Sequence, residues 1–335
     1  MTQPKPVPEL AEPTQSVSDF WATVDRLLER LDADAASKHG VAPLLAERLR
    51  RRGEAVPEAL LPEERAARMM NLIAPSVLRR ARAAYDGPML VLKGPEIAAL
   101  YPGRARMLVD LDVMVGDAQV AWDELLGAGF VRALRLKGVS PGFYHMNPIE
   151  LPGVPLAIEL HKTVKSPTGL RPPSTQALFE AAVPAAVDVP GLLAPAPVHH
   201  AVLLAGHAWA ERPLERLRDL IDVAAMAASL DASELSRVAA EWGWNRLWQT
   251  TERTIDWLLG EGKRPSATRI WARHLDELHA PTFVDVQLRR WASPFWAMPP
   301  LTALAVIASA ILTRRGSRAS VGPFINAPPS CKANR

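Results

Sequence analysis

The sequence predicts an α+β fold in which a small mixed β-sheet is flanked by helical sections on its N-terminal and C-terminal sides. Residues 17–84 carry apolar side chains at helical spacing, which indicates amphipathic helices. From residue 88 the chain changes to short apolar runs separated by Gly and Pro, which is typical of strands. Helical spacing returns at Val198. This order of elements favours a single small sheet with helices around it.

The 335 residues are enough for one large domain or two ordinary ones, and we expect two. Changes in composition along the chain predict where its sections begin and end. We expect a disordered lead-in (1–16), an N-terminal helical section (17–87), the sheet core (88–165), an irregular Pro-rich connection (166–197), a C-terminal helical domain (198–315) and a disordered tail (316–335).

Within the sheet core the apolar runs predict five strands and two helices. The strands are expected at 89–93, 107–115, 130–136, 142–147 and 154–164, and the helices at 95–101 and 117–129. In the C-terminal section, Trp242, Trp244 and Trp248 have helical spacing and are expected to pack in a core rather than to stack on bases. The apolar segment 301–312 predicts a buried or partner-facing helix, with a surface-lying anchor as the alternative.

The overall composition excludes several classes of protein. Lys plus Arg exceed Asp plus Glu by only 39 to 36, so the chain has no general polyanion-binding character and no DNA-binding signature. Segment 301–312 is shorter than the about 20 apolar residues of a membrane-spanning helix, so no transmembrane span is expected. The single cysteine, Cys331, and an N-terminus without the apolar core of a signal peptide predict a cytoplasmic protein.

Two aspartates on an apolar strand are the strongest chemical signal in the chain. Asp110 and Asp112 alternate with Leu and Val, so they point to the same face with Cα atoms about 6.6 Å apart. Burying a carboxylate costs several kcal/mol unless a positive partner compensates it, so a metal ion or an arginine must lie nearby. Glu159, on a later apolar strand, offers a third carboxylate. Three such groups suit Mg²⁺, and a pair of ions favours phosphoryl or nucleotidyl transfer.

Three further residues are candidates for binding the phosphates of a nucleoside triphosphate. Gly94 precedes the predicted helix 95–101, and phosphate oxygens bind well at a helix N-terminus. Lys93 offers a point charge beside this turn, and Arg106 lies four residues before Asp110. Pro95 removes one backbone donor from the same turn.

The histidines are expected to have structural roles. His161 lies on the same strand face as Glu159 and is more typical of a hydrogen-bonded group than of a metal ligand. We set aside a zinc site at His199, His200 and His207, because metal-binding pairs on a helix are normally three or four residues apart and no cysteine assists. The expected partner of His207 is Asp222 or Asp219.

Residues 70–225 resemble the uncharacterised bacterial nucleotidyltransferase family of the polymerase-beta-like superfamily. The resemblance lies in Lys-Gly at a strand end, the following arginine, Asp-x-Asp on an apolar strand and Glu-x-His on a later strand. His207, Arg218 and Asp222 match places in the helical half of that family. The resemblance implies that Asp110 and Asp112 bind both metal ions, that Glu159 holds the catalytic one, and that Gly94 contacts the triphosphate.

We therefore hypothesise a transferase that uses Mg²⁺ or Mn²⁺ and moves a nucleoside monophosphate from a nucleoside triphosphate (NTP) to an acceptor, releasing pyrophosphate. The acceptor could be a small molecule, a peptide, a protein or an RNA. Two alternatives stay open. One is a nucleotide-binding or scaffold protein without turnover, which Pro95 favours, and the other is a toxin-like transferase acting on RNA or protein.

Overall fold

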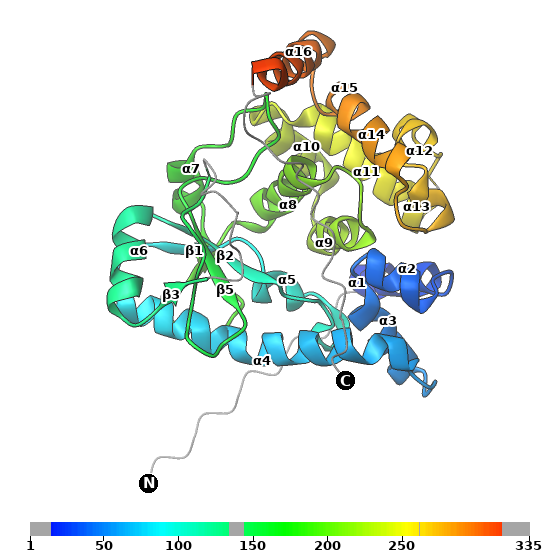
Figure 1. Ribbon diagram of the computed structural model, residues 1–335. Helices are drawn as coiled ribbons and strands as arrows, with labels where there is room; N and C mark the ends of the chain where they lie inside the picture. The colour runs from blue at the N-terminus through cyan, green and yellow to red at the C-terminus, as the bar shows by residue number, and fades with distance from the viewer. Residues whose placement is uncertain (1–14, 134–143, 261, 317–335) are drawn as a thin grey trace.

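A seven-stranded mixed sheet lies at the centre of the protein, with helices on both faces (Figure 1). This computed structural model describes residues 15–133, 144–260 and 262–316. The predicted disorder of the lead-in and tail concerns residues almost wholly outside these ranges. The α+β fold predicted from the sequence, with a mixed sheet between helical sections, is confirmed.

The sheet has the spatial order β3-β4-β5-β2-β1-β7-β6. Its central strands β2 and β5 run parallel, while β1 is antiparallel to β2 and parallel to β7. This arrangement places the two strands that carry the predicted acids next to each other. The strands are β1 (Met89–Val91), β2 (Asp110–Val115), β3 (Val131–Arg132), β4 (Ile149–Glu150), β5 (Ala157–His161), β6 (Val183–Pro184) and β7 (Leu193–Ala194).

Alternation along the strands gives the sheet two different faces. On β2, Leu111, Val113 and Val115 pack into a core with α4 (Leu61–Ala84) and α6 (Ala118–Gly127). Met114 points the other way, into the larger core formed by the remaining helices. Asp110 and Asp112 share the face of Met114, so they point toward α8 (Pro197–Glu211) and the C-terminal helices.

The remaining helices lie around the sheet, including the face that carries Asp110 and Asp112 (Figure 1). Those before and within the sheet are α1 (Gln15–Leu28), α2 (Ala33–Lys38), α3 (Ala42–Arg51), α5 (Pro95–Ala98) and α7 (Thr175–Glu180), with short 3₁₀ turns η1 (Glu58–Leu60) and η2 (Pro102–Arg104). Those after the sheet are α9 (Leu217–Ala227), α10 (Ala232–Glu241), α11 (Asn245–Leu259), α12 (Ser266–Ile270), α13 (His274–Glu277), α14 (Phe283–Ala292), α15 (Pro294–Ala297) and α16 (Pro300–Gly316).

Some strands differ from the sequence prediction. Of the run 130–136, the structure shows only β3 as strand and does not describe residues 134–136. In the run 142–147, His145 makes a single bridge to His161, and the strand β4 begins only at Ile149. The connection 166–197, expected to be irregular, contributes α7, β6 and β7, and β7 joins the sheet beside β1. Two-residue strands are too short to produce a readable alternation, and Pro184 is tolerated because β6 is an edge strand.

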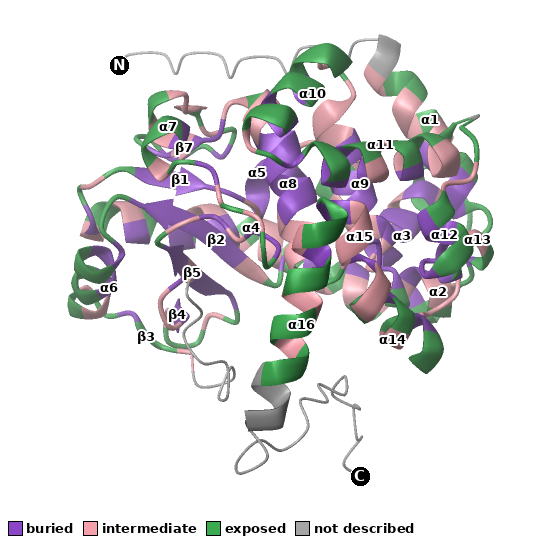
Figure 2. Ribbon diagram, turned by 90° about the horizontal axis from the view of Figure 1, so that it is seen from above, coloured by how far each residue is buried: buried purple, intermediate pink, exposed green. Residues whose placement is uncertain are grey.

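The C-terminal helices bury the tryptophans and expose the last helix. Trp244 and Trp248 are 0% and 2% exposed, and Trp242 packs against the same core, so the core-packing prediction is confirmed. The 301–312 segment is helical, but Leu301 and Leu312 are largely exposed and Ala303 alone among its described side chains is fully buried. The helix is therefore not a buried one, and α16 is mostly green in Figure 2. Among the residues described, no helix is long and apolar enough to cross a bilayer.

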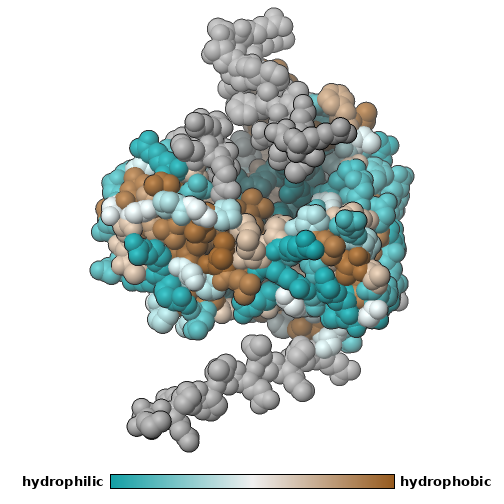
Figure 3. Space-filling model, turned by 60° about the horizontal axis from the view of Figure 1, so that its bottom comes forward, coloured by the Kyte–Doolittle hydropathy of each residue, from teal (hydrophilic) through white to brown (hydrophobic). Residues whose placement is uncertain are grey.

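The outer side of α4 shows the ordinary mixture of a protein surface. Viewed from the side on which α4 lies in Figure 1, hydrophobic patches are interspersed with hydrophilic ones (Figure 3). Met69 and Leu72 are exposed on this helix.

Candidate active site

Three carboxylates meet on the face of the sheet that points toward α8. The parallel register of β2 and β5 places Asp112 opposite Glu159 and Met114 opposite His161. Single ligand atoms from Asp112, Glu159 and His161 all lie within 4.8 Å of one another. Asp110 lies one alternation before Asp112 and lines the same cavity. The structure thus brings together the three acids that the sequence singled out, and adds a histidine to them.

Two histidines lie beside this cluster, and one of them, His161, hydrogen-bonds to it. The Nε2–H of His161 donates to Oδ1 of Asp112 at 2.8 Å. Oε2 of Glu159 lies 3.8 Å from His161 Nε2 and 3.9 Å from His145 Nε2, outside hydrogen-bonding reach. His145 donates its Nδ1–H to the carbonyl of Met146 at 2.7 Å. The interpretation of His161 as a hydrogen-bonded group on the Glu159 face agrees with this geometry.

Burial, together with the charges of neighbouring groups, shifts the pKa values of the three carboxyl groups. Burial raises the pKa of Asp110 to about 7, and the charges of Asp112 and Glu159 contribute to that rise. Burial also raises the pKa of Glu159, again assisted by Asp112. Burial alone would raise the pKa of Asp112, but the hydrogen bond and charge of His161 outweigh it and hold this pKa below its usual range. Burial and mutual repulsion thus favour the protonated form of Asp110, and added positive charge in the cavity would favour its ionised form.

The acids form one wall of a cavity of about 300 Å³. Its other walls come from the turn at Lys93 and Gly94, from Lys165 after β5, and from the segment that joins α8 to α9. The sequence candidates Lys93, Gly94 and Arg106 all line this space.

Gly94 allows the turn after β1 to approach the aspartate strand. Its φ of +84° is a conformation that side-chain-bearing residues rarely adopt. A Cβ at this position would lie 3.1 Å from Leu111 Cδ2 and 3.7 Å from the carbonyl oxygen of Asp110. The turn is followed by α5, which ends at Ala98 and so is shorter than the predicted helix 95–101.

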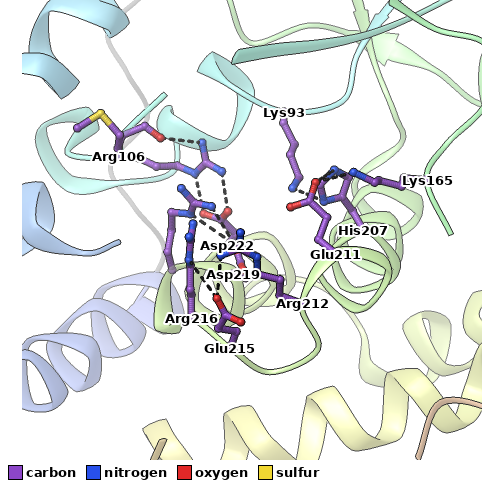
Figure 4. A network of polar contacts seen from close by, with 12 residues as sticks. Lys93, Arg106, Lys165, His207, Glu211, Arg212, Glu215, Arg216, Asp219 and Asp222 are labelled. Atoms are coloured by element: carbon purple, nitrogen blue, oxygen red, sulfur yellow. Dashed lines mark hydrogen bonds and ion pairs between the residues drawn. The ribbon is translucent and has the colours of Figure 1, made fainter. Parts of the chain in front are cut away.

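Lys93 is held by a histidine from α8. Its Nζ lies 2.6 Å from Nδ1 of His207 (Figure 4). Burial and the charge of Lys93 lower the pKa of His207 to about 3, so the imidazole is neutral at physiological pH and its Nδ1 accepts from the ammonium group. On the same helix, Glu211 lies 3.7 Å from His207 Nε2 and binds Lys165 at 2.6 Å. The prediction that His207 bonds Asp222 or Asp219 is therefore wrong.

Asp222 binds Arg106 instead, through a buried and bidentate ion pair. Nε and Nη2 of Arg106 donate to the two carboxylate oxygens at 2.7 Å each (Figure 4). The hydroxyl of Tyr101 also donates to Oδ1, at 2.6 Å. The two charged side chains are only 6% and 3% exposed. An arginine carries a permanent charge and a planar fork, so it competes for a buried carboxylate far better than a neutral histidine does.

The model of a family described as uncharacterised nucleotidyltransferase matches residues 30–260, which is more than half of the chain. The chain belongs to this nucleotidyltransferase family. Neither the curated proteins nor the solved structures contain a significant match.

The family match covers the sheet together with α8 to α11, and so it includes every residue of the cavity described above. Four polar side chains that line the nucleotidyltransferase's cavity were not predicted from the sequence, namely His145, Lys165, Glu211 and Arg216. A signal existed for Glu211, because His207 and Glu211 are four residues apart on one helix face. Nothing local distinguishes Lys165 or His145, which reach the cavity through tertiary packing.

Proposed function

We propose that this family member is a divalent-cation-dependent nucleotidyltransferase that moves a nucleoside monophosphate from an NTP to an acceptor and releases pyrophosphate. One observation carries the proposal. Asp110, Asp112 and Glu159 face one cavity, and within the described part of the chain none of them forms an ion pair with a lysine or an arginine. A cluster of this charge is stabilised by a cation from solution.

The donor set fits a hard divalent ion such as Mg²⁺ or Mn²⁺. Such ions prefer carboxylate oxygens and keep sites for water and substrate phosphate. Asp112 and Glu159 would hold the ion, with Asp110 as a further ligand, and His161 would fix the orientation of the Asp112 carboxylate. When bound, the ion would neutralise charge on the phosphate oxygens of the nucleotide. By resemblance, two ions and a polymerase-beta-like arrangement are part of the same proposal.

The protein's own groups would position the triphosphate. Lys93 presents an ammonium group to the cavity, and the neutral His207 fixes its place without cancelling its charge. Gly94 leaves the backbone open beside Asp110, so that a phosphate can come close to it. Arg106, whose fork is engaged by Asp222, would contribute by fixing the wall from which it comes. This division of roles assigns the chemistry to positioning and charge neutralisation.

A substitution that removes one charge tests the proposal. In Asp112→Asn the amide keeps an oxygen for His161 but loses the negative charge. With labelled NTPs, Mg²⁺ or Mn²⁺, and cell extract as the source of acceptor, we expect pyrophosphate release to fall by about 100-fold or more. Asp123→Asn, on an exposed turn of α6, should behave as the unmodified protein. Turnover retained by Asp112→Asn, or in the presence of a chelator, would contradict the proposal.

A further inference from the structure

The wall of the cavity formed at the start of α9 carries more positive charge than its carboxylates neutralise. Three arginine side chains surround the Glu215 carboxylate. Its oxygens lie 2.9 Å from a guanidinium nitrogen of Arg212, 3.9 Å from Nε of Arg216, and in direct contact with Arg289. Of these three, Arg216 lines the cavity. Its Nε lies too far from Glu215 for a hydrogen bond, and among the described residues its guanidinium has no hydrogen-bond acceptor.

The other basic side chains of the cavity already have partners. Arg106 is bound bidentately by Asp222. Arg218 contacts Asp219 at 3.2 Å. Lys165 binds Glu211, and Lys93 binds His207, as described above. Lys93 keeps further donors for the proposed nucleotide, whereas Arg216 is the cavity arginine, within the described part of the chain, that has no hydrogen-bond acceptor.

The surroundings of Arg216 favour an anion. Its side chain is 34% exposed, enough for a ligand in the cavity to reach it. Burial, followed by the charges of Arg218 and Arg212, lowers its pKa below the usual arginine range. The guanidinium nevertheless stays charged, and a negative group bound beside it would stabilise that charge.

We propose that Arg216 binds a phosphate or carboxylate group of the acceptor, which makes the acceptor an anionic molecule. A guanidinium presents two parallel donors that match the oxygens of either group. Figure 4 shows Arg216 apart from Lys93, His207 and Lys165, the group that stands beside the proposed nucleotide site. The acceptor assignment rests on the proposed nucleotidyl transfer, whereas the anion site itself does not.

The first test measures anion binding without any turnover. Metal-free protein is titrated calorimetrically with inorganic phosphate, and separately with ATP in the presence of Mg²⁺. We expect Arg216→Ala to weaken phosphate binding by about tenfold or more, the value for a lost hydrogen bond to a charged group. Arg216→Lys, which keeps the charge without the fork, should lie between. Arg237→Ala, on the exposed face of α10, is the matched control and should bind as the unmodified protein does.

The outcomes separate the possible sources of the anion. Equal phosphate binding by Arg216→Ala and the unmodified protein, or no binding by either, would overturn the anion site. Weaker binding of ATP by Arg216→Ala would assign the site to the nucleotide and overturn the acceptor assignment. Phosphate binding should persist in Asp112→Asn, so a failure of the proposed transfer reaction would leave this result unchanged.

A second test addresses the acceptor directly. Cell extract is fractionated on an anion-exchange resin before any labelling, and each fraction is then supplied to the enzyme with labelled NTP. We expect the acceptor activity to be retained by the resin, and we expect Arg216→Ala to need about tenfold more of that fraction for the same rate. Acceptor activity confined to the unretained fractions would refute the inference.

Discussion

Removing the carboxylate of Asp222 should destabilise the protein severely, because it leaves the Arg106 guanidinium buried without a counter-charge. Both side chains are at most 6% exposed, and their two hydrogen bonds measure 2.7 Å each. Breaking a buried ion pair of this kind costs about 3–5 kcal/mol. Tyr101 would lose its acceptor as well. Against a typical total of about 5–15 kcal/mol, Asp222→Ala should lose a large share of the free energy of unfolding.

Urea denaturation followed by tryptophan fluorescence measures this loss, since the chain has 10 tryptophans. Glu241→Ala breaks the exposed ion pair with Arg237 and should cost less than about 0.5 kcal/mol. In a double variant, Arg106→Met with Asp222→Met, no uncompensated charge is left, so much of the loss should be recovered. If Asp222→Ala costs no more than Glu241→Ala, or if the double variant is less stable than Asp222→Ala, the reasoning is refuted.

Two further predictions concern the cavity. In metal-free protein Asp110 has its pKa raised from an ordinary 3.8 to about 7, so the folded state holds the proton more tightly and this group lowers stability as pH rises between these values. The stability of Asp110→Asn relative to the unmodified protein should therefore increase from about pH 5 to about pH 8 in urea denaturation with a chelator, and a constant difference would contradict the assignment. His207→Ala should weaken NTP binding by about tenfold because Lys93 loses its hydrogen-bond acceptor, whereas His207→Gln keeps an acceptor and should retain the affinity. If His207→Ala and the unmodified protein bind ATP with equal affinity in a titration with Mg²⁺, the positioning role of His207 is excluded.

The parts of the site that lie on single strands could be predicted from the sequence. The alternation of Asp110 and Asp112 with Leu111 and Val113 fixes which side chains share a face, and this information is local. Glu159 could be assigned to the same site because its apolar run predicts a strand near the aspartate strand. The register that places it opposite Asp112 is known only from the structure. The helical sections were also readable, because apolar spacing persists over many residues.

The pairings between distant side chains could not be predicted. Arg106 and Asp222 are 116 residues apart, and several carboxylates and histidines of the right chemistry compete for each partner. His207 was expected to bond Asp222 or Asp219, but Asp222 forms an ion pair with Arg106, whose charge is permanent. His207 instead hydrogen-bonds to Lys93. Which of these combinations forms depends on how α8 and α9 pack over the sheet, and no local pattern contains that information.

The same packing explains why the candidate site needs both the sheet and the C-terminal helices. The sheet provides the three acids, whereas α8, α9 and the turn between them provide His207, Glu211, Arg216 and Arg218. The boundary expected at 166–197 thus does not divide the site, since cavity residues lie on both sides of it. The Arg106–Asp222 ion pair joins the two layers across the edge of the cavity, so loosening it would also move Arg216 and the α8 groups relative to the carboxylates. Stability and chemistry are therefore expected to be coupled at this contact, and a partly destabilising variant of Asp222 should lose transfer activity before it unfolds.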